Sequence, residues 1–161
     1  MDLRIRPICL GKSYIDKSVL TYLCGPETAL LIPYIIWVIE GGEKIIVVDS
    51  GPGDPEIVAK EPGRDLIRES SEEPLQALKN IGVNPSEVEI VVSTHLHWDH
   101  CGNFPLFPNA DIYVQRRELE FAVAPLEIFG EVYEASLFNR NPKWSCCISR
   151  FRIVEGDVDL I

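Results

Sequence analysis

Two apolar runs, at residues 31–40 and 44–49, lie close together in the chain and are rich in β-branched and aromatic residues. The tripeptide Gly-Gly-Glu at 41–43 separates them, which is typical of the turn of a β-hairpin. The second run contains Ile-Ile-Val-Val at 45–48, and such a continuous apolar stretch indicates a strand covered on both faces. The pattern therefore predicts a hairpin whose second strand is buried and ends in a turn-rich loop, Asp-Ser-Gly-Pro-Gly, at 49–53.

A helix is predicted after a long irregular segment. Residues 54–70 are rich in proline, glycine and charged residues, so we expect them to form a loop. Ser71 is the expected N-cap of the helix, and Pro74 is tolerated in its first turn. Apolar residues then recur at helical spacing until Gly82, which is expected to end the helix.

The second half of the chain continues the alternation of strands and helices. Residues 88–93 and 111–115 are predicted strands, and 116–124 is a short predicted helix that Pro125 ends. Residues 125–147 are aromatic-rich and poorly periodic, which suits a lid or wall over a pocket. The order of elements predicts an α/β (α+β) fold in which helices pack on a sheet.

Composition supports a single domain over residues 1–161. This length suffices for one hydrophobic core and is too short for two domains of ordinary size. Apolar residues make up 46% of the chain and charged residues 25%, which is ordinary for a globular protein. The formal net charge of −10 repels phosphate backbones, so we expect no nucleic-acid partner.

The cysteines and apolar runs indicate a cytoplasmic protein. The five cysteines match no disulfide framework and no CxxC metal site, so we expect reduced thiols. No apolar stretch of a signal peptide follows Met1. The longest apolar run, 29–39, has 11 residues and contains Pro33, whereas a helix needs roughly 20 residues to span a bilayer. We therefore expect no membrane partner.

The candidate chemistry follows directly after the predicted strand 88–93. All three histidines of the chain, His95, His97 and His100, lie within six residues. Asp99 stands among them, and imidazole and carboxylate groups are the usual ligands of Zn²⁺ and related divalent metals. In extended backbone His95 and His97 point to the same side. One short loop can thus offer two ligands to one ion and two to its neighbour, which predicts a metal site; the alternative is a polar turn with structural histidines.

The sequence Thr-His-Leu-His-Trp-Asp-His at 94–100 resembles the signature motif of the metallo-β-lactamase superfamily. Val-Val-Asp-Ser-Gly at 47–51 resembles the second common element of that family. Three further segments are similar to the N-acyl homoserine lactonase branch, whose members are quorum-quenching enzymes: residues 99–103, 112–118 and 153–157. Together the similarity runs from about residue 31 to the end of the chain.

The resemblance implies an αββα sandwich of which this chain supplies roughly the N-terminal αβ half. It also implies two divalent metal ions, Zn²⁺ above all, with Fe, Mn and Co open as alternatives. His95 and His97 would bind the first ion, and Asp99 and His100 the second. A metal-bridging hydroxide would attack the carbonyl of a lactone, and Asp99, beside the leaving oxygen, would shuttle the proton.

Two more residues take a role through the resemblance. Asp49 would orient the histidine loop without binding metal; without the resemblance, a turn carboxylate that caps local backbone amides is the better interpretation. Trp98 is similar in place to an aromatic residue that lines the acyl-chain pocket, and its alternative is an ordinary core aromatic.

The family's site needs more ligands than this sequence contains. A complete site would require two further histidines and an aspartate, and no histidine follows His100. We therefore expect the chain to be an N-terminal portion of a longer protein, with one apolar sheet face left uncovered. It is expected to associate with its missing C-terminal half or to form homo-oligomers.

The leading functional hypothesis is a metal-dependent hydrolase that opens an N-acyl homoserine lactone or a similar lactone or ester. A second hypothesis is another hydrolase of the same fold, such as a glyoxalase II-like thioesterase or a β-lactamase. The third is an inactive metal-binding or interaction module.

Overall fold

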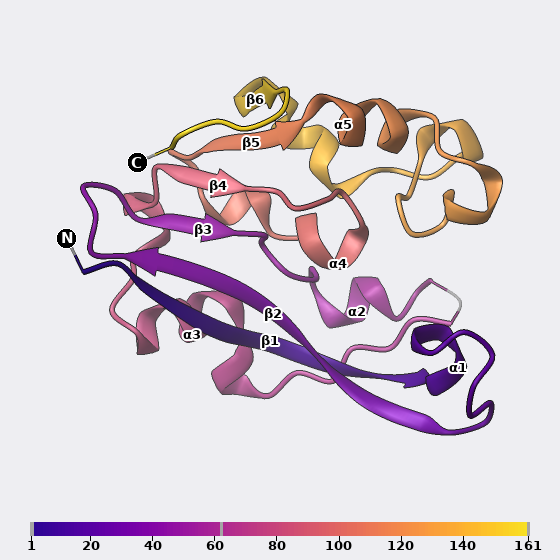
Figure 1. The fold of residues 1–161 in the computed structure, drawn as a ribbon. Coiled ribbons are helices and arrows are strands. Elements are labelled where there is room, and N and C mark those ends of the chain that lie inside the picture. The colour runs from indigo at the N-terminus through magenta and orange to yellow at the C-terminus, as the bar shows by residue number, and fades with distance from the viewer. Residues whose placement is uncertain (1, 62, 161) are drawn as a thin grey trace.

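A computed structural model describes residues 2–61 and 63–160 and contains one mixed six-stranded sheet. Its strands lie side by side in chain order: β1 (Arg4–Asp16), β2 (Ala29–Glu40), β3 (Ile46–Val48), β4 (Ile90–Val92), β5 (Asp111–Gln115) and β6 (Phe151–Val154) (Figure 1). Strand β2 is antiparallel to both of its neighbours, β1 and β3, and β3 to β6 run parallel. The carboxyl ends of β3, β4 and β5 therefore meet at one edge of the sheet.

Short helices connect the strands. The α-helices are α1 (Lys17–Leu20), α2 (Pro55–Val58), α3 (Pro74–Asn80), α4 (Trp98–Cys101) and α5 (Arg116–Val123). Turns of 3₁₀ helix lie at Ser70–Glu72, Pro85–Glu87, Phe104–Leu106, Glu127–Phe129, Ser136–Phe138 and Lys143–Arg150. Within the described residues, no helix combines the length and the apolar composition needed to cross a lipid bilayer.

One face of the sheet carries the hydrophobic core. Side chains alternate between the two faces of a strand, so every second residue of each strand points into this core. Helix α3 packs against β1 and contributes Ala77 and Leu78. The core side chains supplied by the strands are Ile8, Leu10, Ile36, Val38, Val47, Val91, Ile112, Val114 and Phe151.

The opposite face of the sheet is less well covered. The strand register places Trp37, Val48, Val92 and Tyr113 in one row across β2 to β5. Trp37 is 41% exposed, and the other three side chains are half-buried. Ile46 and Ile90 on the same face are buried, so the expected uncovered apolar face is present only in part.

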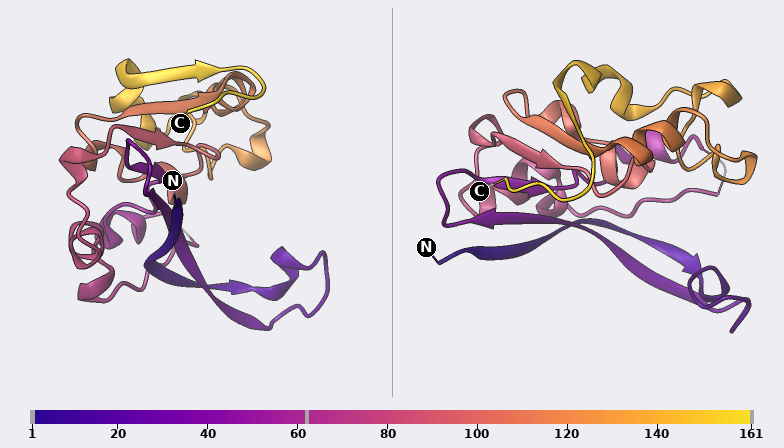
Figure 2. Two further views of the ribbon diagram at one scale, coloured as in Figure 1. Left: turned by 60° about the vertical axis from the view of Figure 1, so that its left-hand side comes forward. Right: turned by 45° about the horizontal axis from the view of Figure 1, so that its top comes forward.

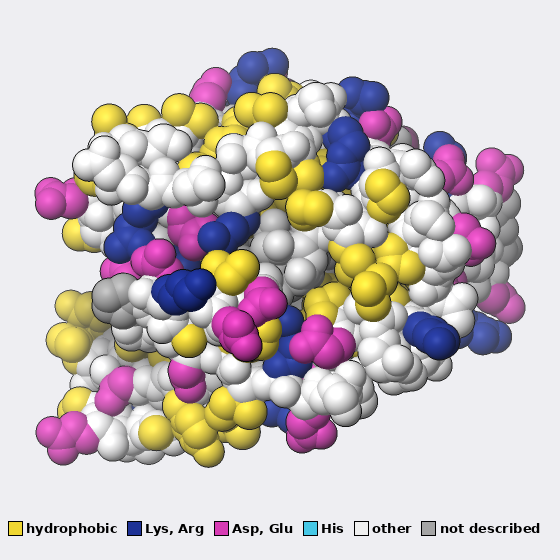
Figure 3. All heavy atoms as spheres, turned by 180° about the vertical axis from the view of Figure 1, so that it is seen from behind, with side chains coloured by type: hydrophobic (Ala, Val, Ile, Leu, Met, Phe, Trp, Pro, Cys, Tyr) yellow, Lys and Arg dark blue, Asp and Glu magenta, His cyan; other side chains and the backbone are white. Residues whose placement is uncertain are grey.

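The β1–β2 hairpin extends far beyond the four short strands and carries α1 at its tip, so that it projects from the body as a twisted arm (Figure 2). A register shift between Cys9 and Lys12 interrupts its ladder where the arm leaves the body. Tyr14, Tyr22 and Leu23 on this arm are mostly exposed. On the face seen from behind, acidic and basic side chains are interspersed around small hydrophobic patches (Figure 3). The net negative charge therefore does not form one continuous field on that face.

Most of the predicted elements are confirmed. The hairpin corresponds to β2 and β3, and the predicted strand 88–93 contains β4. The strand 111–115 is β5, and the helix 116–124 is α5, which ends one residue earlier than predicted.

Three features differ from the prediction. The segment 54–70, expected to be a loop, contains α2, because Asp54 caps it and Pro55 occupies its first turn. The N-cap at Ser71 is wrong, since Ser71 lies in a 3₁₀ turn and α3 begins at Pro74 with Glu73 as its N-cap. Strands β1 and β6 were not predicted; β1 is interrupted by Pro7 and Gly11, which obscure its alternation.

Candidate metal centre

The motif residues lie at the carboxyl edge of the parallel strands, where two loops meet. The loop after β3 begins at Asp49, and the loop after β4 carries His95, His97 and α4. Backbone hydrogen bonds join the loops: Ser50 N donates to His100 O (2.7 Å), and Gly102 N donates to Gly51 O (2.9 Å). Parallel pairing of β3 with β4 thus brings two segments about 50 residues apart into contact.

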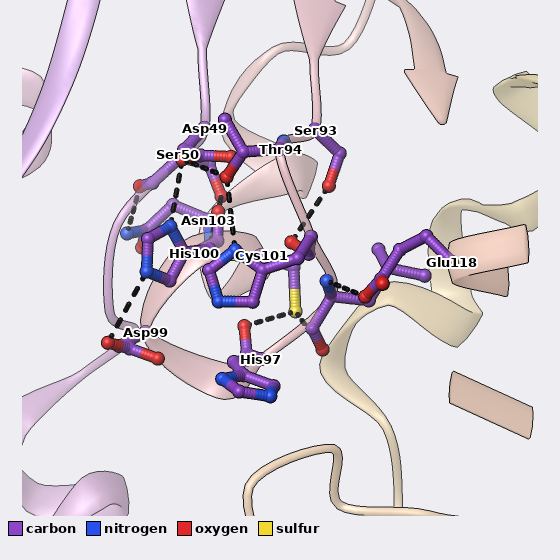
Figure 4. Close-up of polar contacts among 12 residues, drawn as sticks. Asp49, Ser50, Ser93, Thr94, His97, Asp99, His100, Cys101, Asn103 and Glu118 are labelled. Carbon is purple, nitrogen blue, oxygen red and sulfur yellow. Dashed lines mark hydrogen bonds and ion pairs between the residues drawn. The ribbon is translucent and has the colours of Figure 1, made fainter. Parts of the chain in front are cut away.

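The three imidazole rings cluster tightly. The ring centroids of His95 and His97 are 4.4 Å apart, and those of His95 and His100 are 3.8 Å apart. Asp99 Oδ2 lies 3.6 Å from His100 Nε2. In Figure 4 the His100 ring lies between the carboxylates of Asp49 and Asp99. The structure therefore brings all four predicted ligands together, in half-buried positions.

The four donors suit two divalent ions chemically, but they are too few to complete the coordination of both. In the described part of the chain, no three His, Cys, Asp or Glu side chains are placed to hold one ion together. The resemblance assigns two ligands to each ion, whereas structural zinc sites close with four ligands. His100 Nδ1 is held by Asp49, which directs its Nε2 toward Asp99. The chemistry of the donors suits a pair of metals, and neither ion would be fully enclosed.

Burial sets the charge of the histidines. It lowers the pKa of His97 to about 4, with a further contribution from the neighbouring His95 and His100. The pKa of His95 is also lowered, first by burial and then by His100. For His100, burial acts to lower the pKa, but the hydrogen bond to Asp49 and the charge of Asp99 raise it above its usual value. Both shifts favour the neutral imidazole, which is the form that can bind a metal ion.

Asp49 connects the two loops through three hydrogen bonds. Its Oδ1 accepts from Thr94 N (2.8 Å), and its Oδ2 accepts from Thr94 Oγ1 (2.7 Å) and contacts His100 Nδ1 (2.8 Å). The residue is buried and adopts a left-handed backbone conformation, with φ of 61°. Asp tolerates this conformation better than most residues. The carboxylate thus contacts both ends of the histidine motif.

A second connection between the loops was not foreseen from the sequence. Ser50 Oγ donates to His100 O (3.1 Å) and accepts from Asn103 N (3.0 Å). The Asn103 side-chain amide donates to the carbonyl oxygens of Ser50 (2.8 Å) and Pro52 (2.7 Å). Both residues lie inside segments that carry the family resemblance, but nothing in their spacing indicated this contact.

The close approach of these loops requires a glycine at position 102. A Cβ added there would clash with Gly53 N and would lie 2.9 Å from Gly51 O. Both neighbours are backbone atoms, so they cannot move aside cheaply. We expect Gly102→Ala to destabilise the chain by about 1–3 kcal/mol, as overpacking does, and to weaken metal binding because it displaces α4.

Urea denaturation and metal titration would check this prediction. Gly53→Ala is the matched control, because the Cβ at that position meets nothing closer than Gly102 O at 3.6 Å. Equal stability and equal metal affinity of the two variants would contradict the prediction.

The motif is also supported from α5 and from the segment after it. Glu118 Oε1 accepts from Leu96 N (2.7 Å), and its Oε2 accepts from Tyr133 Oη (3.3 Å). The Tyr133 ring packs edge-on against His97, with centroids 4.4 Å apart. The sequence placed Glu118 in a helix but gave no sign that it binds the backbone of the motif. Part of the aromatic-rich region thus forms a wall beside His97.

Trp98 is buried beside a pocket of about 440 Å³. Its ring packs edge-on against Tyr34 (5.7 Å between centroids), and the Arg64 guanidinium lies 4.6 Å above it. The pocket also touches His97 and Asp99 and is bounded by the β1–β2 arm on one side and Val132 on the other. Trp98 is therefore both a packed aromatic and part of a pocket wall next to the candidate ligands.

The sequence is similar to proteins of one family. A family model described as the metallo-beta-lactamase superfamily matches residues 34–159. A curated N-acyl homoserine lactonase of Bacillus thuringiensis is 27% identical over 163 aligned residues, which cover 94% of this chain and 59% of that protein. A lactonase of Azorhizobium caulinodans is 39% identical over 82 residues, covering 51% of this chain and 29% of the relative.

Solved structures show the same fold. A structure of an N-acyl homoserine lactone hydrolase, with the product N-hexanoyl-L-homoserine bound at its catalytic metal centre, matches with a TM-score of 0.75 and 25% identity. It is matched over 100% of this chain and 63% of its own length. A dizinc quorum-quenching lactonase matches with a TM-score of 0.68 at 16% identity, which shows a common fold. The chain thus spans about three fifths of the length of the Bacillus relative and of these two solved structures.

Proposed function

Because this chain belongs to the metallo-beta-lactamase superfamily, we propose that it forms part of a metal-dependent hydrolase that opens a lactone ring, with an N-acyl homoserine lactone as the substrate class. One observation carries the proposal. The four donors gather at the carboxyl edge of β4 next to the pocket beside Trp98, with His100 held in place by Asp49. The names of the relatives and of the product-bound structure support the choice of a lactone.

The proposed metal ligands are His95 and His97 for one ion and Asp99 and His100 for the other. Zn²⁺ suits these nitrogen and carboxylate donors, and Fe, Mn and Co accept the same set. When bound, two such ions would polarise the carbonyl oxygen and supply a nucleophile from water at neutral pH. The choice of zinc is supported by the dizinc quorum-quenching lactonase that has this fold.

The residues of the chain would hold the substrate and move the proton. Asp99 lies on the pocket wall together with His97 and Trp98, so a substrate in the pocket contacts its carboxylate. A carboxylate in this position can accept the proton that the attacking water releases and pass it to the leaving oxygen of the opened ring. Trp98 offers an apolar surface for the acyl chain.

The remaining ligands are proposed to come from a second αβ layer packed on the open sheet face, supplied either by the C-terminal half of the fold or by a second copy of the chain. The partly exposed row that contains Trp37 and Val48 supports this docking. An inert metal-binding module is the second candidate function. It is favoured by one observation, namely that no three described donors are placed to hold an ion together.

A substrate comparison under equal metal loading tests the proposal. The protein that carries the complete site should hydrolyse an N-acyl homoserine lactone with a kcat/KM at least roughly tenfold above that for a thioester or a β-lactam. Chelation should abolish turnover, and Zn²⁺ should restore it. The 161-residue chain alone should bind metal more weakly and turn over little substrate. Equal turnover of all three substrates, or turnover that survives chelation, would reject the lactonase assignment.

A further inference from the structure

Arg64 is a buried cation in the wall of the pocket beside Trp98, and neither the metal ligands nor the family motif accounts for it. Its side chain is 7% exposed. Nη1 donates to Glu134 Oε1 (2.9 Å), and Nη2 donates to Glu131 O (2.5 Å). The face of the guanidinium lies 4.6 Å from the centre of the Trp98 ring.

These contacts join three segments that are far apart in the sequence. Arg64 follows α2, Trp98 begins α4, and Glu134 lies in the segment between α5 and β6. The segment 131–134 contacts the candidate metal centre directly, because Val132 O accepts from Trp98 N (3.0 Å) and Tyr133 packs on His97. An interaction that fixes the position of segment 131–134 therefore also fixes the position of Tyr133 beside His97.

The charge and the geometry of the Arg64 side chain indicate that it is the residue that anchors segment 131–134. A buried guanidinium requires a partner, and Glu134, with 5% of its side chain exposed, provides one. Lys143 Nζ lies 4.0 Å from the same Glu134 oxygen and its side chain is 38% exposed, so Arg64, at 2.9 Å, is the closer and more buried cation. Among the described residues, the other oxygen of Glu134 has no hydrogen-bond partner. Glu134 also adopts a left-handed conformation, with φ of 50°, which its surroundings must maintain. A planar fork that stacks on an aromatic ring while it donates two hydrogen bonds is a geometry that arginine provides and lysine does not.

We propose that Arg64 is a positioning residue that fixes the distance between Trp98 and the wall segment 131–134, and thereby sets which acyl chains fit the pocket. This inference rests on the proposed function for its substrate, while the contacts themselves do not depend on it. Arg64 is not proposed to bind a substrate anion, because Glu134 already neutralises its charge.

The chain contains a matched control pair. Arg140 forms an ion pair with Glu61, which joins the same two regions of the chain at the surface, and its Nη2 lies 3.8 Å from Oε1 of the exposed Glu131. The control therefore also removes an exposed contact with the segment 131–134. The side chains of this pair are 28% and 34% exposed, compared with 7% and 5% for Arg64 and Glu134. Exposed pairs of this kind contribute little to stability. The double variant R140M/E61Q therefore removes an ion pair between these regions and leaves the buried one intact.

Hydrogen exchange on the 161-residue chain tests the contact without reference to activity. The double variant R64M/E134Q removes the interaction and leaves no uncompensated buried charge, so it is safer for folding than R64M alone. We expect amide exchange at residues 131–135 to accelerate by roughly tenfold or more, together with a changed near-ultraviolet circular dichroism of Trp98. R64K should be intermediate, and R140M/E61Q should match the wild type. Unchanged exchange in R64M/E134Q and R64K would overturn the proposal.

Steady-state kinetics of the protein that carries the complete site test whether Arg64 affects the choice of acyl-chain length. In R64K and R64M/E134Q we expect KM for a long-chain acyl homoserine lactone to rise roughly tenfold while kcat and metal content change little, because uniform binding is lost. KM for a short-chain lactone should rise less. Equal losses for both chain lengths would overturn the role in substrate selection. If the wild-type protein turned over no lactone, the proposed function would fail, whereas the exchange rates would still decide whether Arg64 fixes the wall.

Discussion

Replacing Asp99 with asparagine in the protein that carries the complete site is expected to lower lactone turnover by roughly 10²–10⁴-fold, the range of a positioned proton-transfer group. The substitution keeps the shape of the side chain but removes its charge and its ability to accept a proton. Because Asp99 lies 3.6 Å from His100 Nε2 and lines the pocket, the loss affects both the proposed second metal position and the leaving oxygen. The measurement is kcat/KM for a homoserine lactone together with metal content per chain.

Asp157→Asn is the control for this experiment. Asp157 is exposed and lies outside the motif, so its substitution removes the same charge without affecting the site. If Asp99→Asn retained full turnover, neither the ligand role nor the proton-transfer role of Asp99 could stand. A variant with normal metal content and reduced turnover would separate the second role from the first.

The second large effect is expected at Asp49. Removal of its carboxylate by Asp49→Ala leaves Thr94 N, Thr94 Oγ1 and His100 Nδ1 without their acceptor. A buried donor left without a partner costs about 1–3 kcal/mol, and alanine in a left-handed conformation adds roughly 1 kcal/mol. Thr94 is exposed and its hydroxyl also contacts His95 Nδ1, so water and His95 replace part of what its two donors lose. We expect the free energy of unfolding of the 161-residue chain to fall by about 3–5 kcal/mol in urea denaturation. Metal affinity should fall roughly 10–100-fold, because the His100 ring is no longer held.

Asp49→Asn separates the backbone contribution from the charge. Asparagine tolerates the left-handed conformation and still accepts from Thr94 N, but its amide group cannot accept from His100. This variant should lose less stability than Asp49→Ala and nearly as much metal affinity. If both variants bound metal as tightly as the wild type, the contact between Asp49 and His100 would be irrelevant to the site.

Much of the local structure could be predicted because local chemistry decides it. The apolar run at 45–48 can be satisfied only as a buried strand, and it is β3. The limits of β5 and the start of α5 follow from a change in hydrophobic period at Arg116. Strands β1 and β6 were not predicted, because they form through pairing with neighbouring strands and their own sequences show no clear strand pattern. Their partners are β2 and β5, and long-range pairing overrides weak local preference.

The candidate site also contains residues that the local sequence indicated and residues that only the tertiary structure brings to it. His95, His97, Asp99 and His100 are neighbours in the chain, so their spacing alone brings four donors into one loop. Asp49 was suggested by resemblance, and its contact with His100 depends on the parallel register of β3 and β4. The sequence did not indicate the contacts that Glu118, Tyr133 and Arg64 make with the motif. Each of these residues lies in another segment, and the sequence does not show that this segment packs against the motif.

The sequence by itself determined the order of most strands and helices and which side chains are candidate metal ligands, since periodicity and ligand chemistry are properties of adjacent residues. Only the tertiary structure decided how the ligands are held: His100 between two carboxylates, His97 against Tyr133, and Trp98 beneath Arg64. The physical reason is that hydrogen bonds and aromatic contacts act over a few ångströms. A contact between residues about 50 positions apart therefore exists only once the sheet has brought its strands together.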